Sequence, residues 1–415
     1  MLTQAPKGTL DMLPRDAHRW QSIYDNMRAV CERAGYREIR TPVFEHTELF
    51  QRGVGDATDV VQKEMYTFED KGHRSITLKP EGTAGAVRAF IEGHLNDSLP
   101  CKLYYAQCPC FRYEKPQAGR LRQFHQNGVE VFGAKDASVD AEIIDLAMKM
   151  LAANVLHNLK LTINSIGCPD CRAKYLEKLK AYLEPKLGGL CKTCQERYER
   201  NPLRILDCKE DQDKLGDAPA MLDNLCPDCA EHFEKLKSYL AALGIEYEID
   251  ARIVRGLDYY TRTVFEIILD SPQGALTVCG GGRYDGLVKE LGGQDTPGIG
   301  FGMGIERMIL AQDLTGAAPA EPPLYDAFVV TMGDDARLEG VKLVNELREA
   351  GLRADLDHAA RSMKAQFKYA NKLGAPKVIV IAGDELEKGV VKLRDMVNST
   401  EEEVSRSDIV SVLTK

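Results

Sequence analysis

The side chains best suited to chemistry stand close together in one stretch, Val-Arg-Gly-Leu-Asp-Tyr-Tyr-Thr-Arg-Thr-Val-Phe-Glu. It places a fixed cation (Arg255), a carboxylate (Asp258) and two adjacent phenols (Tyr259 and Tyr260) just before an apolar run that predicts a strand. Such groups on a rigid edge can bind a small, planar, hydrogen-bonding side chain beside an anion. The simpler alternative is a surface turn with two half-buried tyrosines.

A second candidate group stands where a predicted strand passes through Pro80 into a predicted helix. Glu81 and Thr83 fall at the helix entry, where side chains can face a ligand rather than the core. For Glu81 alone, the simpler interpretation is a first-turn acid that is favoured by the helix dipole.

Two further runs, 102–110 and 123–132, predict antiparallel strands that are joined by a long polar loop. Arg112 follows the first strand, and the loop carries Arg120 and Arg122 together with a lysine. A loop of this length with three cations predicts a contact with phosphate or nucleic acid, and a solvated loop is the alternative.

Gln126 and Glu130 lie four residues apart on the second of these strands, so both project to one face. Phe124 and Gly128 share that face, and the glycine would make room for a ligand against the sheet. The same face could instead be exposed to solvent.

Glycine recurs at every second position over 298–304, directly before a predicted helix that carries Arg307. This pattern clears one face of a strand, so that a flat ligand can lie on the backbone and Arg307 can reach a phosphate at its end. Neither this cluster nor the one at 280–286 matches a dinucleotide fingerprint or a P-loop. Any nucleotide here is therefore expected to be held by arginines and a sheet.

Twelve cysteines in a chain that starts without a signal-peptide core indicate thiols or a metal rather than disulfides. Paired thiolates at Cys-x-x-Cys spacing suit tetrahedral zinc. A clamp that closes the neck of an insertion over 169–229, the pairing of the first two pairs in a zinc ribbon, and reduced thiols without metal all remain open. The pairs are Cys168/Cys171, Cys191/Cys194 and Cys226/Cys229, with Cys208 alone.

The overall composition is that of an ordinary globular protein: 415 residues, 44% hydrophobic, 28% charged and a net charge of −9. No apolar run approaches the length of a membrane span, so we expect a cytoplasmic protein without a membrane partner. Because the net charge is negative, a nucleic acid must be held by local basic patches.

The elements that must position these groups fall into two predicted domains. Residues 1–320, with the insertion over 169–229, form the larger one, and residues 325–415 show the strand-helix alternation of a small α/β domain. The larger domain begins with a helix that Gly35 ends, followed by an edge strand over 36–44. In the smaller domain a basic helical face, or a merely solvated one, is predicted from Arg361, Lys364, Lys368 and Lys372.

With these motifs side by side, the sequence resembles the bacterial histidyl-tRNA synthetases over nearly its whole length. Residues 36–45, 111–130 and 300–307 are similar to the three signatures of class II synthetases, the first being the dimer-forming one. The more specific signatures of the histidine enzymes are similar to Arg255-Gly-Leu-Asp-Tyr-Tyr260 and Gly280-Gly-Gly-Arg-Tyr-Asp-Gly286. The resemblance implies an α+β fold, with an antiparallel sheet flanked by helices, a helical insertion and a C-terminal anticodon-binding domain.

The activity implied by the resemblance is a histidine–tRNA ligase. Histidine attacks the α-phosphorus of ATP, which is expected with Mg²⁺; pyrophosphate leaves, and the histidyl group passes to the 3′ end of tRNA(His). By resemblance Arg112 and Arg255 approach the α-phosphate and the histidine carboxylate, while Arg307 holds the γ-phosphate. The cysteine pairs do not belong to the general family pattern, so a structural Zn²⁺ gains no support from it.

The remaining residue roles follow the substrates. The amino group of histidine would meet Glu81, Thr83 and Gln126, and its imidazole would meet Glu130, Tyr259 and Tyr260. Contacts to tRNA are expected from Arg120, Arg122, Arg361, Lys364 and Lys368. The partners implied are L-histidine, ATP, tRNA(His) and a second copy of the chain in a homodimer.

Two other functions fit parts of the sequence. One is a non-catalytic, histidine-sensing regulatory subunit of ATP phosphoribosyltransferase, which usually lacks the C-terminal domain and departs from the histidine signatures. The other is a zinc-clamped scaffold for nucleic acid, which would need the basic faces without an amino-acid pocket.

Overall fold

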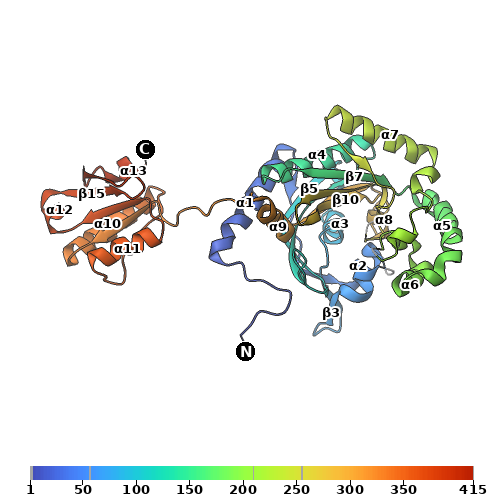
Figure 1. Ribbon diagram of the computed structural model, residues 1–415, viewed down its shortest axis with the longest axis horizontal. Helices are drawn as coiled ribbons and strands as arrows, with labels where there is room; N and C mark the ends of the chain where they lie inside the picture. The colour runs from blue at the N-terminus through green and yellow to red at the C-terminus, as the bar shows by residue number, and fades with distance from the viewer. Residues whose placement is uncertain (1–2, 56–57, 209, 254–255, 415) are drawn as a thin grey trace. The chain divides into compact units, whose positions relative to one another are not determined.

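A mixed eight-stranded sheet is the frame of the first part of the chain (Figure 1). The computed structural model describes residues 3–55, 58–208, 210–253 and 256–414. The strands of this sheet are β1 (Arg37–Glu38), β5 (Cys101–Phe111), β6 (Gln123–Phe132), β7 (Leu159–Ser165), β8 (Glu248–Ile249), β9 (Thr261–Ser271), β10 (Gly274–Arg283) and β11 (Gly298–Gly304). Their order is β1-β5-β6-β11-β10-β9-β7-β8, antiparallel throughout except for the short outer strands β1 and β8.

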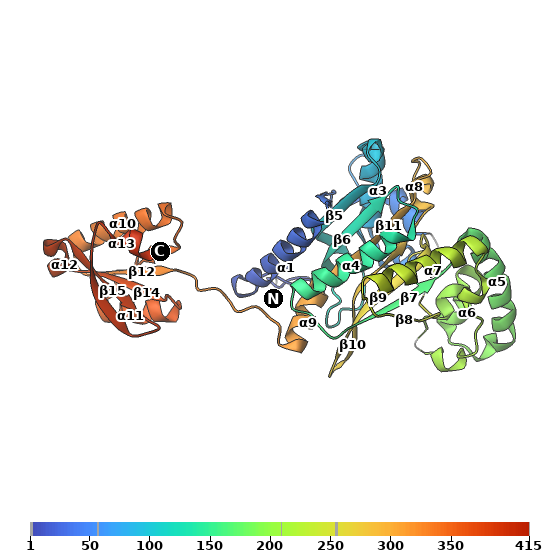
Figure 2. The same cartoon turned by 90° about the horizontal axis from the view of Figure 1, so that it is seen from above.

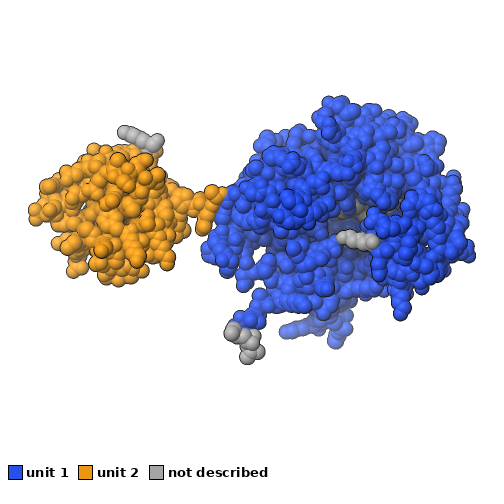
Figure 3. Space-filling model, in the orientation of Figure 1, with its two compact units in different colours: residues 1–319 blue, residues 320–415 orange. Residues whose placement is uncertain are grey.

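Contacts divide the chain into two units, Met1–Pro319 and Ala320–Lys415, which Figure 3 shows in different colours. Each unit has its own apolar core. The sheet belongs to the first unit. The predicted hairpin of two long antiparallel strands is confirmed as β5 and β6, and the predicted glycine-rich strand is confirmed as β11, which passes directly into a helix at Ile305.

One face of the sheet is covered by helices. Alternate residues of the central strands, such as Val129 and Phe301, point into the main core together with Ile23 and Ile143 of the covering helices. Figure 2 shows three of these helices, α1, α4 and α7, side by side. The covering helices are α1 (Pro14–Arg33), α4 (Ala137–Ala153), α7 (Pro227–Ala242) and α9 (Ile305–Thr315).

A second, three-stranded sheet of order β2-β4-β3 precedes the hairpin in the chain. The prediction of one strand over 36–44 is wrong, because β1 and β2 belong to different sheets and the chain between them, which contains Pro42, is not in a strand. The elements of this region are β2 (Phe44–His46), α2 (Thr47–Val54), η1 (Val60–Glu64), β3 (Tyr66–Glu69), β4 (Ser75–Leu78), α3 (Thr83–Glu92) and η2 (Leu95–Asp97), and a short helix α8 (Leu287–Glu290) packs against α3.

The predicted insertion forms a helical layer beside β7 with its own small core. Its two longer helices are α5 (Pro169–Leu183) and α6 (Lys192–Arg200). The other elements are short: η3 (Glu184–Gly189), η4 (Pro202–Ile205), η5 (Gln212–Lys214) and η6 (Met221–Asn224).

The second unit is a five-stranded sheet of order β13-β12-β14-β15-β16 with helices on both faces, since two separate apolar clusters cover it. Its elements are β12 (Ala327–Thr331), α10 (Asp334–Glu349), β13 (Ala354–Leu356), α11 (Met363–Lys372), β14 (Lys377–Ile381), α12 (Gly383–Lys388), β15 (Val390–Asp395), β16 (Thr400–Ser405) and α13 (Ile409–Leu413). The predicted basic helical face is wrong in one member, because α11 begins at Met363 and Arg361 precedes it.

Among the described residues, none of the helices combines the length and the apolar character that crossing a membrane requires.

Candidate active site

A cavity of about 410 Å³ lies against the face of the large sheet that is turned away from the main core. Because side chains alternate along a strand, the face of β6 and β11 opposite to core residues Val129 and Phe301 is turned to the cavity, and Gln126 and Gly302 on that face line it. Its lining includes Glu81, Thr83, Tyr105, Arg112, Arg120, Gln126, Tyr259, Tyr260, Gly302, Gly304 and Arg307. Seven of the predicted substrate residues therefore meet in one place, and they come from segments far apart in the chain.

Glu81 is both a helix cap and a cavity residue. Its carboxylate accepts the backbone N–H groups of Thr83 at 2.9 Å and Ala84 at 2.7 Å, and the hydroxyl of Tyr259 donates to it at 3.4 Å. The start of the helix therefore fixes this carboxylate at the cavity wall, and its binding of a ligand stays a prediction.

Gln126 is oriented in the same way. Its side-chain oxygen accepts the backbone N–H of Gly82 at 3.1 Å and the thiol of Cys110 at 3.5 Å. The amide nitrogen is left toward the cavity beside Gly302, where an added Cβ would lie 3.2 Å from it.

Glu130 lies one layer behind the cavity and is fully buried. Its carboxyl group accepts the hydroxyls of Thr83 at 2.8 Å and Tyr105 at 3.1 Å, and the hydroxyl of Tyr284 at short range. Burial raises the pKa of Glu130 from 4.5 to about 8, and the three hydrogen bonds oppose that rise only in part. The surroundings of this carboxyl therefore favour its protonated form.

The alternating glycines of β11 divide into two pairs. An added Cβ would lie 2.2 Å from the ring of Tyr284 at Gly298 and 2.0 Å from the carboxyl of Glu130 at Gly300. The first pair therefore makes room for the protein's own side chains, and Gly302 and Gly304 line the cavity. The prediction of a cleared face holds for half of the strand.

The Tyr259–Tyr260 segment is held from the insertion. The guanidinium of Arg172 on α5 donates to the carbonyl of Asp258 at 3.1 Å and to that of Tyr260 at short range. The two tyrosine rings lie 4.7 Å apart between centroids, and both are buried. The alternative of half-buried tyrosines on a surface turn is excluded. Arg255 lies outside the described residues.

The other end of the cavity carries cations. Arg112 donates to the carbonyl of Pro80 at 2.8 Å, and Arg307, in the first turn of α9, donates to that of Thr277 at 2.7 Å. Gly119 of the β5–β6 loop packs against Arg307, and the neighbouring Arg120 lines the cavity with its side chain half exposed. This part of the predicted phosphate loop thus faces the cavity.

The other predicted cations have different surroundings. Arg122 stacks 3.9 Å above the ring of Tyr113, and Arg361 pairs with Asp357 and stacks 4.2 Å above Tyr369. Their geometry is that of structural contacts. The predicted lysines Lys364 and Lys368 are exposed on α11.

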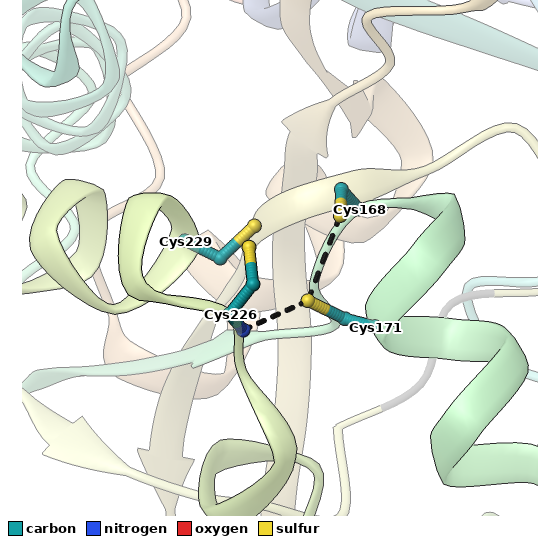
Figure 4. Close-up of side chains that lie close together, drawn as sticks. All are labelled: Cys168, Cys171, Cys226 and Cys229. Carbon is teal, nitrogen blue, oxygen red and sulfur yellow. Dashed lines mark hydrogen bonds between the residues drawn. The ribbon is translucent and has the colours of Figure 1, made fainter.

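Two cysteine pairs meet at the neck of the insertion (Figure 4). Cys168 and Cys171 begin α5, and Cys226 and Cys229 begin α7; all four sulfur atoms lie within 4.8 Å of one another. The sulfur atoms of Cys168 and Cys171 are 3.5 Å apart, and the backbone N–H of Cys226 donates to Cys171 at 3.0 Å. The competing pairing with Cys191 and Cys194 is not formed.

Sequence reasoning missed two tyrosines of the site. Tyr105 fills the space above Gly82 and Gly128, where an added Cβ would lie 2.5 Å and 2.4 Å from its ring, and it connects the cavity to Glu130. Tyr284 lies in the glycine cluster at 280–286. That cluster was recognised as a motif, but no role was predicted for the tyrosine ring. The glycine at 128 was the available signal for Tyr105, because it makes room for a protein side chain as readily as for a ligand.

Comparisons with known proteins point to one family over nearly the whole chain. A family model described as histidyl-tRNA synthetase matches residues 8–308, and one described as an anticodon binding domain matches residues 326–415. The chain is 57% identical to the histidine–tRNA ligase of Alkaliphilus oremlandii, with 99% of this chain and 98% of the relative covered. It is 54% identical to that of Clostridium perfringens, with 100% of both covered.

Solved structures are similar in the same way. The apo histidyl-tRNA synthetase of S. aureus superposes with a TM-score of 0.86 at 41% identity, covering 99% of this chain and 100% of that one. An ATP phosphoribosyltransferase regulatory subunit/histidyl-tRNA synthetase from Bacillus halodurans matches at a TM-score of 0.64 and 21% identity, over 92% of this chain and 99% of that one. At that identity the second likeness concerns the fold alone.

Proposed function

Since the chain belongs to the histidyl-tRNA synthetase family and joins histidine to tRNA, we propose that its cavity binds histidine at the Glu81 end and ATP at the Arg307 end. The observation that carries this division is the order of side chains along β11: Glu130 beside Gly300, Gln126 beside Gly302 and Arg307 beside Gly304. Two residues of strand span about 6.6 Å. The hydrogen-bonding recess beside Gly302 and the phosphate site beside Gly304 are therefore separated by about that distance along β11.

Histidine presents an ammonium group and an imidazole to the recess. The ammonium group donates to Glu81, with Thr83 and Gln126 beside it, and the imidazole lies against Tyr259 and Tyr260. Buried hydroxyls and carboxyls of this kind discriminate strongly, because an analogue without ring nitrogens would leave them unpaired. Glu130 is a positioning residue that acts through Tyr105 and Thr83, since these two hydroxyls stand between it and the cavity.

ATP lies on the flat surface of Gly302 and Gly304. Arg112 contacts the α-phosphate, together with Arg255 by family resemblance, and Arg307 contacts the γ-phosphate. The histidine carboxylate attacks the α-phosphorus, and pyrophosphate leaves. Negative charge grows on the α-phosphoryl oxygens in this step, so cations held in advance by backbone carbonyls stabilise the transition state.

Magnesium enters as part of the substrate MgATP, as is general for class II synthetases. Glu114 and Glu266 also line the cavity and offer the hard oxygen ligands that Mg²⁺ prefers. They are two of the acidic residues of the cavity lining that are suited to hold the ion.

The second unit belongs to the anticodon-binding domains. We assign contacts with the tRNA to the exposed Lys364 and Lys368 of α11, whereas Arg361 is engaged by Asp357 and Tyr369. Of the two predicted loop arginines, Arg120 lines the cavity and is placed to meet the 3′ end of the tRNA, whereas Arg122 is engaged by Tyr113.

A structural Zn²⁺ in the cluster of Cys168, Cys171, Cys226 and Cys229 would tie the two ends of the insertion together. Four thiols within 4.8 Å of one another, two from each helix start, fit the tetrahedral all-sulfur set that zinc prefers. The ion would fix the start of α5, from which Arg172 holds the Tyr259–Tyr260 segment.

A homodimer through the first class II signature fits the surface of the three-stranded sheet. Val43, Phe44 and Phe68 leave 42%, 52% and 49% of their surface exposed, an apolar group that a second copy would cover. Cytoplasmic action is proposed with the function.

Histidine-dependent exchange of pyrophosphate into ATP tests the assignment without tRNA. The purified protein should catalyse the exchange only with histidine present, and should then charge tRNA(His). Histidine binding without exchange would favour the regulatory-subunit function instead. The presence of Arg112, Arg307 and the C-terminal unit argues against that alternative.

A further inference from the structure

A second cluster of metal-ligand side chains lies inside the insertion, apart from the neck. Cys191 and Cys194 begin α6, and Cys208 and Asp211 come from the turn after η4. One ligand atom from each of these four lies within 4.8 Å of the others. In sequence the cluster reads Cys-x-x-Cys followed by Cys-x-x-Asp, so a carboxylate stands where a fourth cysteine would complete a pair of zinc knuckles.

The distances suit a tetrahedral ion. With metal–sulfur bonds of about 2.3 Å, two sulfur ligands of zinc lie about 3.8 Å apart. The sulfur atoms of Cys191 and Cys208 are 3.8 Å apart, and the sulfur of Cys208 is 3.8 Å from an oxygen of Asp211. Both separations are too long for disulfide or strong hydrogen bonds and are close to what a shared metal imposes.

The contacts of Asp211 are those of a metal ligand held by its neighbours. Its side chain is fully buried, one oxygen accepts the backbone N–H of Cys191 at 2.9 Å, and the other accepts Lys214 at 2.8 Å. The oxygen that faces the thiols keeps a lone pair for a metal. Three thiolates and a carboxylate around Zn²⁺ leave two negative charges, and Lys214 supplies a neighbouring cation.

The insertion also needs such support. Among the described residues, four of the twelve buried members of its core are cysteines of the two clusters, and the others are apolar side chains such as Tyr175, Leu179 and Ile205. Layers of this size rarely bury enough apolar surface to hold a fixed structure without a metal or a disulfide, and the described cysteines are all unbridged.

We propose that Cys191, Cys194, Cys208 and Asp211 form a second zinc site, distinct from the neck cluster, which fixes α6 and η4 against the rim of the catalytic cavity. Three side chains of this segment reach the rim. Arg197 pairs with Asp59 at 2.7 Å, Asn201 donates to Asp258 at 2.6 Å, and Arg204 lines the cavity. A carboxylate among the ligands favours Zn²⁺ over Cu(I) or an iron–sulfur cluster.

Zinc content of the purified full-length protein, measured by plasma mass spectrometry, tests the site. Relative to the unsubstituted protein, Cys191→Ser/Cys208→Ser should lose about one equivalent of zinc per chain. Cys101→Ser, outside both clusters, is the matched control and should lose none. Cys168→Ser/Cys171→Ser tests the neck separately, so failure of one site leaves the other measurable. Equal zinc in the unsubstituted protein and in Cys191→Ser/Cys208→Ser would overturn the proposal.

Asp211→Cys keeps the test valid if the double-serine variant does not fold. This substitution completes a four-cysteine set, so zinc should be retained, and the cobalt-loaded protein should gain sulfur-to-metal charge-transfer absorbance over the unsubstituted protein. The Asp211→Ala variant should lose the second zinc to a competing chelator more readily than the unsubstituted protein does. An unchanged cobalt spectrum in Asp211→Cys would exclude Asp211 from the ligand set.

Discussion

The two ends of the catalytic cavity differ in how far their polar side chains are buried and in what holds those side chains in place. At the Glu81 end, carboxyl and hydroxyl groups are buried and hydrogen-bonded to one another before a ligand arrives. At the Arg307 end, guanidinium groups remain partly exposed and are aimed by backbone carbonyls. A small ligand with several hydrogen-bonding atoms requires the first arrangement, and a hydrated triphosphate requires the second, because charge acts over a longer range than a hydrogen bond.

The largest effect is expected from breaking the charged end. Arg112→Ala removes the cation that we propose to contact the reacting phosphate, and it should lower kcat/KM for ATP by about 10³-fold in pyrophosphate exchange. Arg112→Lys keeps the charge without the planar fork and should recover part of the loss. A decrease below tenfold for Arg112→Ala would remove this residue from the reacting centre.

The buried end should be detectable in how the free energy of unfolding depends on pH. The Glu130 carboxyl keeps its proton up to a pKa of about 8 in the folded state, whereas the unfolded chain loses it near 4.5. The folded protein therefore loses stability as pH rises between these values, by about 3–5 kcal/mol from this group. Glu130→Gln should abolish that component.

Urea unfolding at pH 5 and pH 8.5 measures this difference. Trp20, the single tryptophan, is buried in the core of the first unit, so its fluorescence follows that unit alone. Parallel pH dependence in Glu130→Gln and the unsubstituted protein would mean that Glu130 is already ionised at neutral pH.

A smaller effect is expected from a change at Tyr105, and it tests whether this side chain belongs to the histidine end. Tyr105→Phe keeps the ring above Gly128 and removes only the hydroxyl that donates to Glu130 at 3.1 Å. We expect KM for histidine to rise about tenfold, the value of one buried hydrogen bond, while KM for ATP stays unchanged. A rise in KM for ATP alone would instead place this ring at the phosphate end of the cavity.

The smallest effect is expected outside the cavity. Lys364→Ala/Lys368→Ala should raise KM for tRNA several-fold and lessen its dependence on salt, because two phosphate contacts are lost. Pyrophosphate exchange serves as the internal control and should not change. Equal charging in both proteins at physiological salt would assign tRNA binding to another face of the second unit.

Much of the charged end could be predicted from the sequence, because each arginine follows a recognisable strand or opens a helix. The buried end was harder. Strand alternation correctly put Gln126 and Glu130 on one face, but it could not tell that Tyr105 would cover Gly128 and leave Glu130 one layer back. That depth depends on which side chain fills the space above a glycine, and the choice is made by tertiary packing.

The cysteines illustrate a second limit. Their spacing predicted metal knuckles, yet which pairs meet depends on how α5, α6 and α7 turn back on one another. Cys208 seemed alone because its partner at the knuckle spacing is an aspartate rather than a cysteine. Likewise Arg361 matched a helical spacing but precedes the helix, where Asp357 engages it.

The most direct test of a cavity with two distinct ends is a kinetic comparison of Tyr259→Phe with Arg307→Ala in pyrophosphate exchange. Tyr259→Phe should raise KM for histidine about tenfold and leave KM for ATP unchanged, and Arg307→Ala should do the reverse. If both substitutions raised the same constant, the division of the cavity into a histidine end and a phosphate end would be wrong.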